Sequence, residues 1–485
     1  MNATTGNEPH DNAADVDWAS LAPEGGDRIP ELLGRVAGSD SALSDLHDII
    51  RFPEPGHRAA PKVVDHLVDA ATADETPDMD RWRPLSLLLE LVAAHAEDRF
   101  PEHRDLAQWR DEVAWATSND AEKVRTQYRT WRDEAPDEQH HHRMRNRLAV
   151  MESDEGAELL QAELDTYEAV LARVPDLVAL LHGGTNRGGL DRAGEWVSYL
   201  LAFLPDESAR IVSEITGASQ FLLAKDLRPT PKAPTSLRDA MDQASGGGSG
   251  GNSDPLPAEL FALGLLAAPH DIDTTIGLTH QMAGGNLYNS FAAAVATVLI
   301  HGENTPREGL RRIGRGGGTS MGYEGLFNES WPHCGPRSPQ VLGFLALGRA
   351  GDRARRLRLD ILPGLIKGED ESRALVTGVG LELVLGPRSK DRTPEEHAQA
   401  DYDEETLKVL WAIAELPASA WEDEEFTATL AAWALPDDAE EFCALVGVEP
   451  EPEPEAVPVQ EAPQSQQAPQ APQGLFGRLF GGGRP

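Results

Sequence analysis

The chain has 485 residues, of which 40% are apolar and only 6% aromatic, and its formal net charge is -38 at pH 7. Because nucleic-acid affinity comes largely from Lys and Arg side chains that displace counterions from phosphates, this charge argues against direct binding of DNA or RNA. The apolar residues are mainly Ala, Leu and Val, which favours small-residue packing of helices over sandwiches or barrels.

Residues 1–14 are polar, and we expect them to be disordered. They contain no basic stretch followed by an apolar core, so no signal peptide is expected. The longest apolar run, residues 291–300, is half the length of a membrane span. The two cysteines, Cys334 and Cys443, are far apart and form no CxxC pair, which argues against a disulfide framework. We therefore expect a cytoplasmic protein.

Helical periodicity dominates residues 15–227. One apolar stripe at i, i+3, i+4 and i+7 consists of Ile29, Leu32, Leu33 and Val36, and the next consists of Val63, Val64, Leu67 and Val68. Alternating strand patterns are almost absent. The sequence therefore predicts an all-α fold.

Helices are also predicted in pairs over residues 195–215, 289–313 and 339–366, each pair joined by a short turn. Helix–turn–helix units of about 40 residues are typical of a helical solenoid. The Gly, Ser and Pro content of residues 228–257 predicts a flexible linker between an array over 15–227 and a second array over 258–448. Residues 449–473, rich in Pro, Glu and Gln, are predicted to be disordered, and residues 474–485 form a short apolar tail.

Several segments resemble actinobacterial HEAT-repeat proteins: "DVDWASL", "APKVVDHLVDAA", "TYEAVLARVPDLVALL", "YLLAFLPDESA", "FALGLLA" and the two closing segments "LKVLWAIAELPASAW" and "FTATLAAWALPDDAEEFCALVG". The resemblance extends over residues 15–447. It implies a curved α-solenoid that binds other macromolecules, and it brings no catalytic residues with it. The chain departs from the family pattern at the Gly/Ser linker and at the C-terminal tail.

Four motifs invite a chemical interpretation. The adjacent His140, His141 and His142 point about 100° apart on a helix, so they do not converge on one ion, and a solvated helix end is expected. The glycine-rich run at 314–322 lacks the Lys of a phosphate-binding loop and is expected to join repeats. The neighbours His333 and Cys334 lack a third, orienting group.

The fourth motif is "APHDIDTTIGLTH", whose polar residues are His270, Asp271, Asp273 and His280. It resembles the metal-binding HD pair of helical phosphohydrolases, which need further His and Asp ligands on separate helices. Asp271 also suits a turn residue that caps the next helix. We expect no metal and no cofactor, and we keep a helical metal-dependent hydrolase as one alternative.

The C-terminal tail "GLFGRLFGGGRP" carries the candidate binding residues. In a helix, Leu475, Phe476, Leu479 and Phe480 would share one face, with Arg478 opposite. The pattern resembles the short membrane-targeting helix of the MinD class of division ATPases. Three glycines and an acidic neighbouring segment make a single copy a weak anchor. Docking in a groove of another protein and packing on the chain's own solenoid are the competing interpretations.

These observations favour a non-enzymatic scaffold or adaptor. Its tail is expected to engage a partner protein or the inner face of a membrane, without nucleic acid. An immunity-type inhibitor, whose acidic charge caps a basic toxin, is the main alternative. The partner, the binding face of the solenoid and the oligomeric state stay open.

Overall fold

The computed structural model describes residues 13, 16–93, 105–135, 138–183, 192–219, 257–267, 275–283, 287–316, 339–368, 372–387, 393, 396–397 and 399–448. Throughout these residues the regular elements are helices, so the predicted all-α class is confirmed. The chain divides into two compact units, the first ending at Ile300 and the second beginning at His301.

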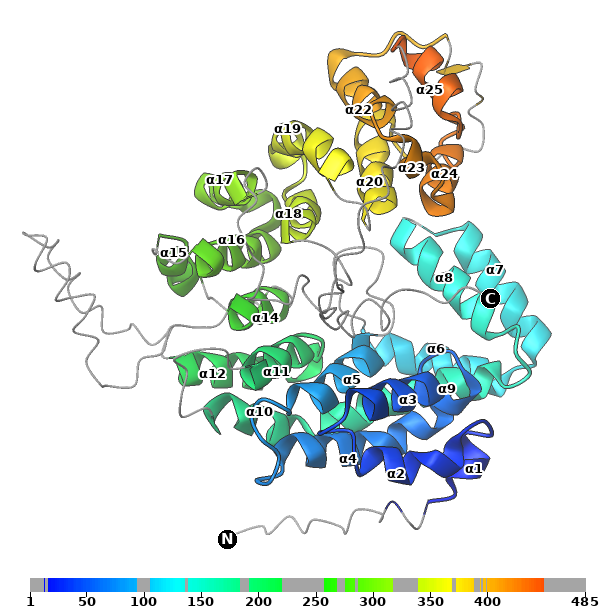
Figure 1. Ribbon diagram of the computed structural model, residues 1–485, viewed down its shortest axis with the longest axis vertical. Coiled ribbons are helices and arrows are strands. Elements are labelled where there is room, and N and C mark those ends of the chain that lie inside the picture. Colours follow the sequence, from blue (N-terminus) through cyan, green and yellow to red (C-terminus); the bar gives the residue numbers. More distant parts are fainter. Residues whose placement is uncertain are drawn as a thin grey trace, which may run out of the picture. The chain divides into compact units, whose positions relative to one another are not determined.

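The first unit contains most of the helices (Figure 1). In chain order they are α1 (Trp18–Leu21), η1 (Gly26–Arg28), α2 (Ile29–Leu33), α3 (Asp40–Ile50), η2 (Pro55–Ala59), α4 (Ala60–Thr72), α5 (Trp82–Ala93), α6 (Leu106–Ser118), α7 (Ala121–Asp133), α8 (Glu138–Val150), α9 (Gly156–Ala172), α10 (Val174–Gly183), α11 (Arg192–Ala202), η3 (Pro205–Glu207), α12 (Ser208–Ser219), α14 (Pro257–Ala267), α15 (Thr275–Ala283) and α16 (Leu287–His301).

The core of the first unit is built around α4, which packs against α5, α9 and α10. The predicted stripe on α4 is confirmed, because Val63, Val64, Leu67 and Val68 are fully buried. The apolar stripe predicted from Ile29 to Val36 is only partly helical in the structure. The helix ends at Leu33, before Gly34, although Val36 is buried as expected. Glycine lowers helix stability, so the chain leaves the helix there and buries Val36 from a turn.

Small residues allow close helix packing further along this unit. A Cβ atom placed on Gly264 of α14 would lie 2.5 Å from the Cα atom of Ala296 on α16, so only glycine fits at that position. On its other sides α14 packs against α11 and α12. Residues on both sides of the predicted 228–257 linker therefore contribute to one compact unit. Residues 228–256 of that linker lie outside the described residues, and residue 257 begins α14.

Aspartate side chains begin many of these helices. The carboxylate of Asp105 accepts a hydrogen bond from the backbone N–H of Gln108, and that of Asp120 accepts one from Lys123. Four further aspartates cap helices in the same way: Asp17, Asp403, Asp423 and Asp438. A capping carboxylate satisfies N–H groups that have no partner within the helix and interacts favourably with the helix dipole. Part of the chain's negative charge thus stabilises helix starts.

The second unit continues the helical pattern (Figure 1). Its elements are η5 (Gly302–Asn304), α17 (Arg307–Gly316), α18 (Pro339–Leu347), η7 (Gly348–Ala350), α19 (Asp352–Gly368), α20 (Arg373–Leu385), α22 (Glu404–Ala414), α23 (Ala418–Trp421), α24 (Glu424–Ala431) and α25 (Ala439–Val446).

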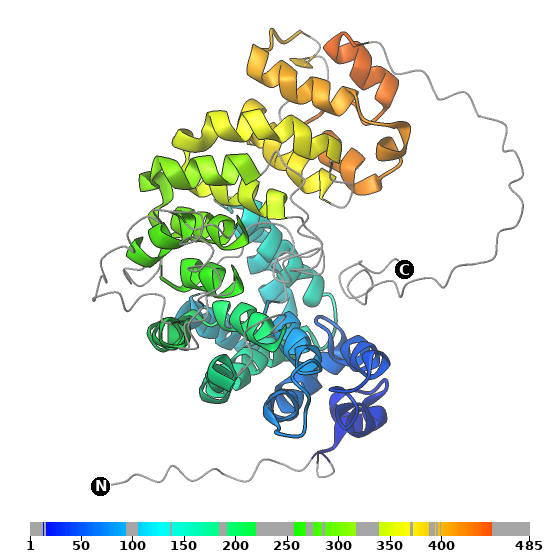
Figure 2. The same cartoon turned by 60° about the vertical axis from the view of Figure 1, so that its left-hand side comes forward.

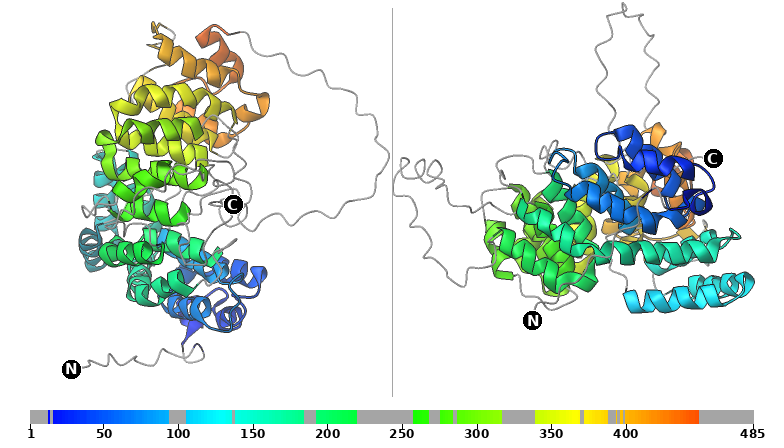
Figure 3. Two further views of the ribbon diagram at one scale, coloured as in Figure 1. Left: turned by 90° about the vertical axis from the view of Figure 1, so that its left-hand side faces the viewer. Right: turned by 90° about the horizontal axis from the view of Figure 1, so that it is seen from below.

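Neighbouring helices of the second unit pack in sequence, as Figures 2 and 3 show in colours from yellow-green to orange-red. Helix α18 packs against α17 and α19, and α19 lies between α17 and α22. Helix α20 packs against α19, α22 and α24, and α25 packs against α22. The predicted pair over 339–366 corresponds to α18 and α19, with the break at η7. In the pair predicted over 289–313, α16 ends at His301 and α17 starts at Arg307, as expected.

Candidate interaction surface

The tail residues predicted to bind a partner or a membrane lie outside the described residues: Leu475, Phe476, Arg478, Leu479 and Phe480. The same is true of the leader, of residues 449–473, of the His270–Asp271 pair and of the His333–Cys334 pair. These interpretations stay predictions.

Among the described residues, no group of three or more His, Cys, Asp or Glu side chains is arranged to hold a metal ion. Of the four polar candidate residues of the motif "APHDIDTTIGLTH", His280 alone is described, in the last turn of α15. The side chain of Cys443 is buried and its thiol is free, and burial raises its pKa. A buried thiol with a raised pKa is a poor nucleophile, because the thiolate is the reactive form.

A different feature stands out on the second unit: a row of arginines on α17. Arg307, Arg311 and Arg315 follow one another at four-residue spacing, so they lie along one face of the helix, and all three are exposed. The opposite face carries Leu310 and Ile313, which are buried. The sequence "REGLRRIGRG" thus forms an amphipathic helix whose solvent face is almost entirely cationic.

A second row of arginines follows on η7 and α19. Arg349, Arg353 and Arg356 are exposed and fall at i, i+4 and i+7. A terminal nitrogen of the Arg353 guanidinium donates a hydrogen bond of 2.5 Å to the backbone carbonyl of Glu303 in η5, which holds the end of this side chain against the neighbouring turn. We call the six residues of the two rows the arginine surface: Arg307, Arg311, Arg315, Arg349, Arg353 and Arg356.

Glycine brings the two rows together. A Cβ atom placed on Gly314 would lie 2.5 Å from Cδ1 of Leu357, so α17 and α19 approach closely at this point. At the start of the two helices, a Cβ atom on Gly351 would lie 3.1 Å from a carboxylate oxygen of Glu303, so η5 and η7 are also adjacent. Two such contacts, one at the start and one further along, indicate that α17 and α19 run side by side in the same direction.

This arrangement also revises one expectation. Residues 314–322 were predicted to form a loop, but α17 extends through Gly316. The glycine at position 314 serves close helix packing within α17. The remainder of the glycine-rich run lies outside the described residues.

The local charge balance is opposite to that of the whole chain. From Gly302 to Gly316 and from Pro339 to Gly368 there are ten Lys and Arg against four Asp and Glu, in a chain of net charge -38. The four acidic residues are Glu303, Glu308, Asp352 and Asp360. Exposed charges act over about 8 Å at physiological ionic strength, so a ligand of similar size experiences this cationic surface more strongly than the distant acidic ones.

Internal ion pairs engage the other edge of α19. Arg355 reaches Glu405 of α22 at 3.2 Å and donates to the carbonyl of Leu383 at 2.9 Å, and Lys367 pairs with Glu415. By contrast, no ion pair joins Arg307, Arg311 or Arg356 to another residue that the structure describes. Three guanidinium groups thus remain available for an anionic ligand.

Sequence reasoning missed this surface because it treated charge only as a total for the chain. The signal was present in the runs "REGLRRIGRG" and "GRAGDRARRLRLD". Each run alone is typical of a solvated helix face. Only the packing of α17 beside α19 shows that the two runs form one surface.

The first unit contains its own arginine clusters, but these hold helices together. Arg147 of α8 is 2% exposed. It pairs with Glu163 of α9, also 2% exposed, and its Nε donates to Glu112 of α6 at 3.1 Å. The hydroxyl of the fully buried Tyr128 donates to the same Glu112 oxygen at 3.0 Å. Burial, followed by the charge of Glu112, raises the pKa of this phenol. A buried network of this kind links four helices and leaves no group for a ligand.

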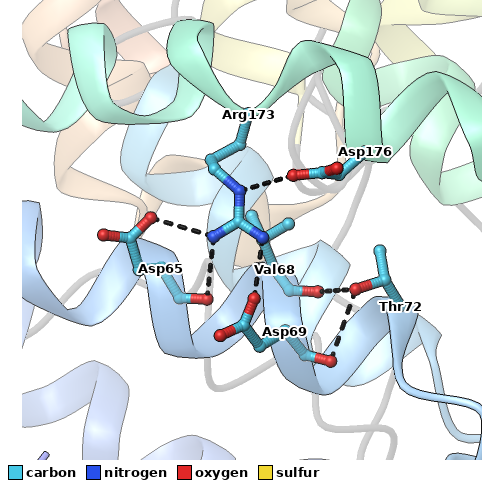
Figure 4. Close-up of polar contacts among 6 residues, drawn as sticks. All are labelled: Asp65, Val68, Asp69, Thr72, Arg173 and Asp176. Carbon is cyan, nitrogen blue, oxygen red and sulfur yellow. Dashed lines mark hydrogen bonds and ion pairs between the residues drawn. The ribbon is translucent and has the colours of Figure 1, made fainter. Parts of the chain in front are cut away.

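The second cluster joins α10 to α4 (Figure 4). Arg173 stands between α9 and α10, and its guanidinium donates to Asp65 at 2.9 Å, to Asp69 at 2.7 Å and to Asp176 at 2.7 Å. Only 12% of its side chain is exposed. Burial opposes the charge of Arg173, but its hydrogen bonds to Asp69, Asp176 and Asp65 outweigh burial and raise its pKa. All three carboxylates are therefore engaged within the fold.

None of the described helices has both the length and the apolar character needed to cross a membrane. Comparison with protein-family models, with curated proteins and with solved structures gave no match to this chain.

Proposed function

We propose that this protein is a non-enzymatic interaction scaffold with a HEAT-like repeat architecture, whose arginine surface receives an acidic polypeptide segment of a partner protein. The observation that supports it best is the reversal of charge on α17 and α19, where six exposed arginines gather on one surface of a strongly acidic chain. Guanidinium groups bind carboxylates through paired hydrogen bonds, so a segment rich in Asp and Glu matches this surface.

The packing of the second unit favours a scaffold. Helix α19 packs against α17, α18, α20 and α22, so each helix is stabilised by its neighbours in the chain. Arrays of this kind expose the solvent faces of successive helices as one continuous surface, which suits the binding of an extended ligand. An extended acidic peptide can therefore contact both arginine rows.

The arginine surface suits a short acidic peptide better than a nucleic acid. An acidic segment of a few residues interacts mainly with the charges within about 8 Å. A long nucleic acid would extend beyond the arginine surface and meet the acidic remainder of the chain. The partner is accordingly a protein with a short carboxylate-rich segment.

The expected affinity is modest. An exposed ion pair contributes about 0.2–1 kcal/mol, so the three available guanidinium groups give about 0.6–3 kcal/mol in total. A micromolar complex needs about 8 kcal/mol. A second contact is therefore required, and the predicted tail motif from Leu475 to Phe480 supplies it. Two weak contacts on one chain gain affinity through effective concentration.

Fluorescence anisotropy with a labelled hexaglutamate peptide tests this function. The full chain carrying Arg307→Gln, Arg311→Gln and Arg356→Gln is expected to bind the peptide about 3- to 150-fold more weakly than the natural chain, because three ion pairs of about 0.2–1 kcal/mol each are lost. A matched control removes the same charge from three exposed arginines of the first unit, Arg35→Gln, Arg51→Gln and Arg129→Gln. Equal loss in both variants would contradict the proposal, because it would indicate a general charge effect.

A further inference from the structure

We propose that His57 is an acid-sensitive switch of the first unit: neutral, it holds η2 against α3 and α9, and protonation of its ring releases η2. The inference goes beyond the proposed function and is independent of it, because the arginine surface belongs to the second unit. It begins from the place of His57 in η2, the short 3-10 helix between α3 and α4. The side chain of His57 is fully buried there, although it can carry a charge.

The two ring nitrogens of His57 have different surroundings. Nδ1 lies 2.8 Å from the backbone carbonyl oxygen of Ile50, the last residue of α3. Because a carbonyl oxygen can only accept, Nδ1 carries a proton and donates it in this hydrogen bond. Nε2 is buried and has no hydrogen-bond partner among the residues that the structure describes. These contacts fit the neutral imidazole, in which Nε2 holds a lone pair.

Protonation of the ring would add an N–H donor and a positive charge at Nε2. A buried donor without an acceptor costs about 1–3 kcal/mol, and an unpaired buried charge adds to this cost. The ring of Phe52, whose centroid lies 5.1 Å from that of the imidazole, offers no lone pair to accept the new proton. The packed position of His57 therefore tolerates only the neutral ring.

The charged groups around η2 are largely engaged elsewhere. The element packs against α1, α3, α4 and α9, and α1 carries no charged residue. Arg58 of η2 itself lies 3.5 Å from Glu155 and 3.0 Å from Glu158. The titratable and charged residues on the other three helices are Asp40, Asp45, His47, Asp48, Lys62, Asp65, His66, Asp69, Glu158, Glu163, Asp165 and Glu168.

Glu163 of α9 acts on His57 through its charge, but Arg147 already pairs with this carboxylate. Burial lowers the pKa of His57, and the hydrogen bond to Ile50 and the charge of Glu163 oppose this without offsetting it. The pKa in the folded state therefore lies below the ordinary value of 6.5. Neutral His57 stabilises the packed η2 fully above pH 6.5, and this contribution is lost as the pH falls from 6.5 through the lowered pKa.

His47 of α3 responds to acid in the opposite direction. Burial lowers its pKa as well, but its hydrogen bond to Glu90 and the charge of Glu90 outweigh burial and hold the pKa above 6.5. Acid thus strengthens the contact of α3 with α5 while it weakens the contact of α3 with η2. The release is accordingly expected in η2 rather than throughout the unit.

The packing of η2 also favours a local response. Its backbone is held by 3-10 hydrogen bonds, which have poorer geometry than those of an α-helix, and its buried residues are Gly56, His57 and Ala59. A Cβ atom on Gly56 would lie 2.0 Å from the carbonyl oxygen of Ile49, so η2 lies directly on the end of α3. Helices α4 and α9 pack against each other without η2 between them. The segment can therefore open while its neighbours stay folded.

Hydrogen–deuterium exchange of the full chain tests the switch, measured by mass spectrometry on peptides that cover residues 52–59. After correction for the intrinsic effect of pH on exchange, this segment of the natural chain is expected to exchange about 3- to 25-fold faster at pH 5 than at pH 7. The upper limit follows from an open state with an ordinary histidine and a packed state that excludes the proton.

His57→Asn is the matched variant, because its side-chain amide can donate to the carbonyl of Ile50 but does not titrate. Its corrected exchange in this segment is expected to be the same at both pH values. His280→Asn removes an exposed histidine from α15 and is expected to behave like the natural chain. Equal corrected rates at pH 5 and pH 7 in the natural chain would overturn the inference. An unchanged pH response in His57→Asn would do the same, because another group would then be responsible.

A further measurement covers the case in which His57→Asn does not fold. Nuclear magnetic resonance of the natural chain, with 13C at the histidine Cε1 position, follows the titration of all 15 imidazoles. An imidazole that titrates below pH 6.5, in parallel with the faster exchange of residues 52–59, is the expected result. Titration of every imidazole at or above pH 6.5 would overturn the inference and leave the proposed function intact.

Discussion

Arg147 of α8 and Glu163 of α9 form an ion pair in which both side chains are almost completely buried. Removing one member leaves the other charged and without its main partner in a medium of low polarity, whereas replacing both by apolar residues removes the problem. Glu163→Gln is therefore expected to lower the free energy of unfolding by about 3–5 kcal/mol. The double change Arg147→Met with Glu163→Leu should cost clearly less. Urea unfolding followed by far-UV circular dichroism measures both, and a double variant as unstable as the single one would contradict this account.

Two glycines within helices are expected to respond in opposite directions to alanine. At Gly264 a Cβ atom would meet the backbone of Ala296 at 2.5 Å, whereas at Gly364 of α19 nothing lies within 4 Å. Gly364→Ala should stabilise its unit by about 0.5–1 kcal/mol through helix propensity. Gly264→Ala gains the same propensity but forces two helices apart, so a net loss of about 1–3 kcal/mol is expected. Thermal unfolding of the two variants and of the natural chain shows whether each substitution raises or lowers stability.

His47 makes part of the stability depend on pH. Burial lowers the pKa of His47, but the hydrogen bond and charge of Glu90, with the charge of Asp48, outweigh it, so the pKa lies above 6.5. Nε2 of His47 lies 2.5 Å from Glu90, and the ring is 7% exposed. A raised pKa in the folded state stabilises the fold below pH 6.5, and this contribution is lost as the pH rises through the raised value.

Glu90→Gln should remove this contribution. The difference in the free energy of unfolding between the natural chain and the variant is expected to reach about 1–3 kcal/mol near pH 5.5 and to shrink above the raised pKa. The measurement compares the variant with the natural chain at each pH, because His57 also affects stability. Burial lowers the pKa of His57, so its contribution to stability changes with pH in the opposite direction to that of His47. Unfolding curves from pH 5 to 9 provide the measurement, and a difference that grows with pH would refute the assignment.

The tail prediction concerns residues outside the described part of the chain. Phe476→Ala with Phe480→Ala is expected to leave the unfolding temperature unchanged, because the residues are predicted to lie outside the core. The same change should abolish recruitment to a partner or to vesicles containing anionic lipid. Vesicle co-sedimentation and pull-down with a defined partner distinguish the two receivers. A drop of several degrees would instead show that the tail packs on the body of the protein.

The helices themselves could be predicted from local periodicity. The stripe from Val63 to Val68 is buried as expected, because a 3.6-residue period is a property of the chain alone. Helix ends were less predictable. Gly34 ends a helix although the apolar pattern continues to Val36, whereas Gly314 continues one because Leu357 packs against it. The same residue type has opposite effects at the two positions, and the neighbour that decides between them is remote in sequence.

The arginine surface could not be predicted for a similar reason. Arg311 and Arg353 are 42 positions apart in the chain. The helices that carry them are neighbours because α17 packs beside α19, which periodicity does not specify. Buried pairs such as Arg147 and Glu163 are equally hidden, because a charged residue in a helical pattern is normally assigned to the solvent face.

The aspartates at the helix starts allow charge to be separated from fold. Asparagine caps a helix about as well as aspartate does. Substituting it at Asp17, Asp105, Asp120, Asp403, Asp423 and Asp438 would remove six negative charges while keeping the hydrogen bonds that begin these helices. Such a chain would be a tool for titrating the long-range field of the protein, with its architecture held constant, against the association rate of any charged ligand.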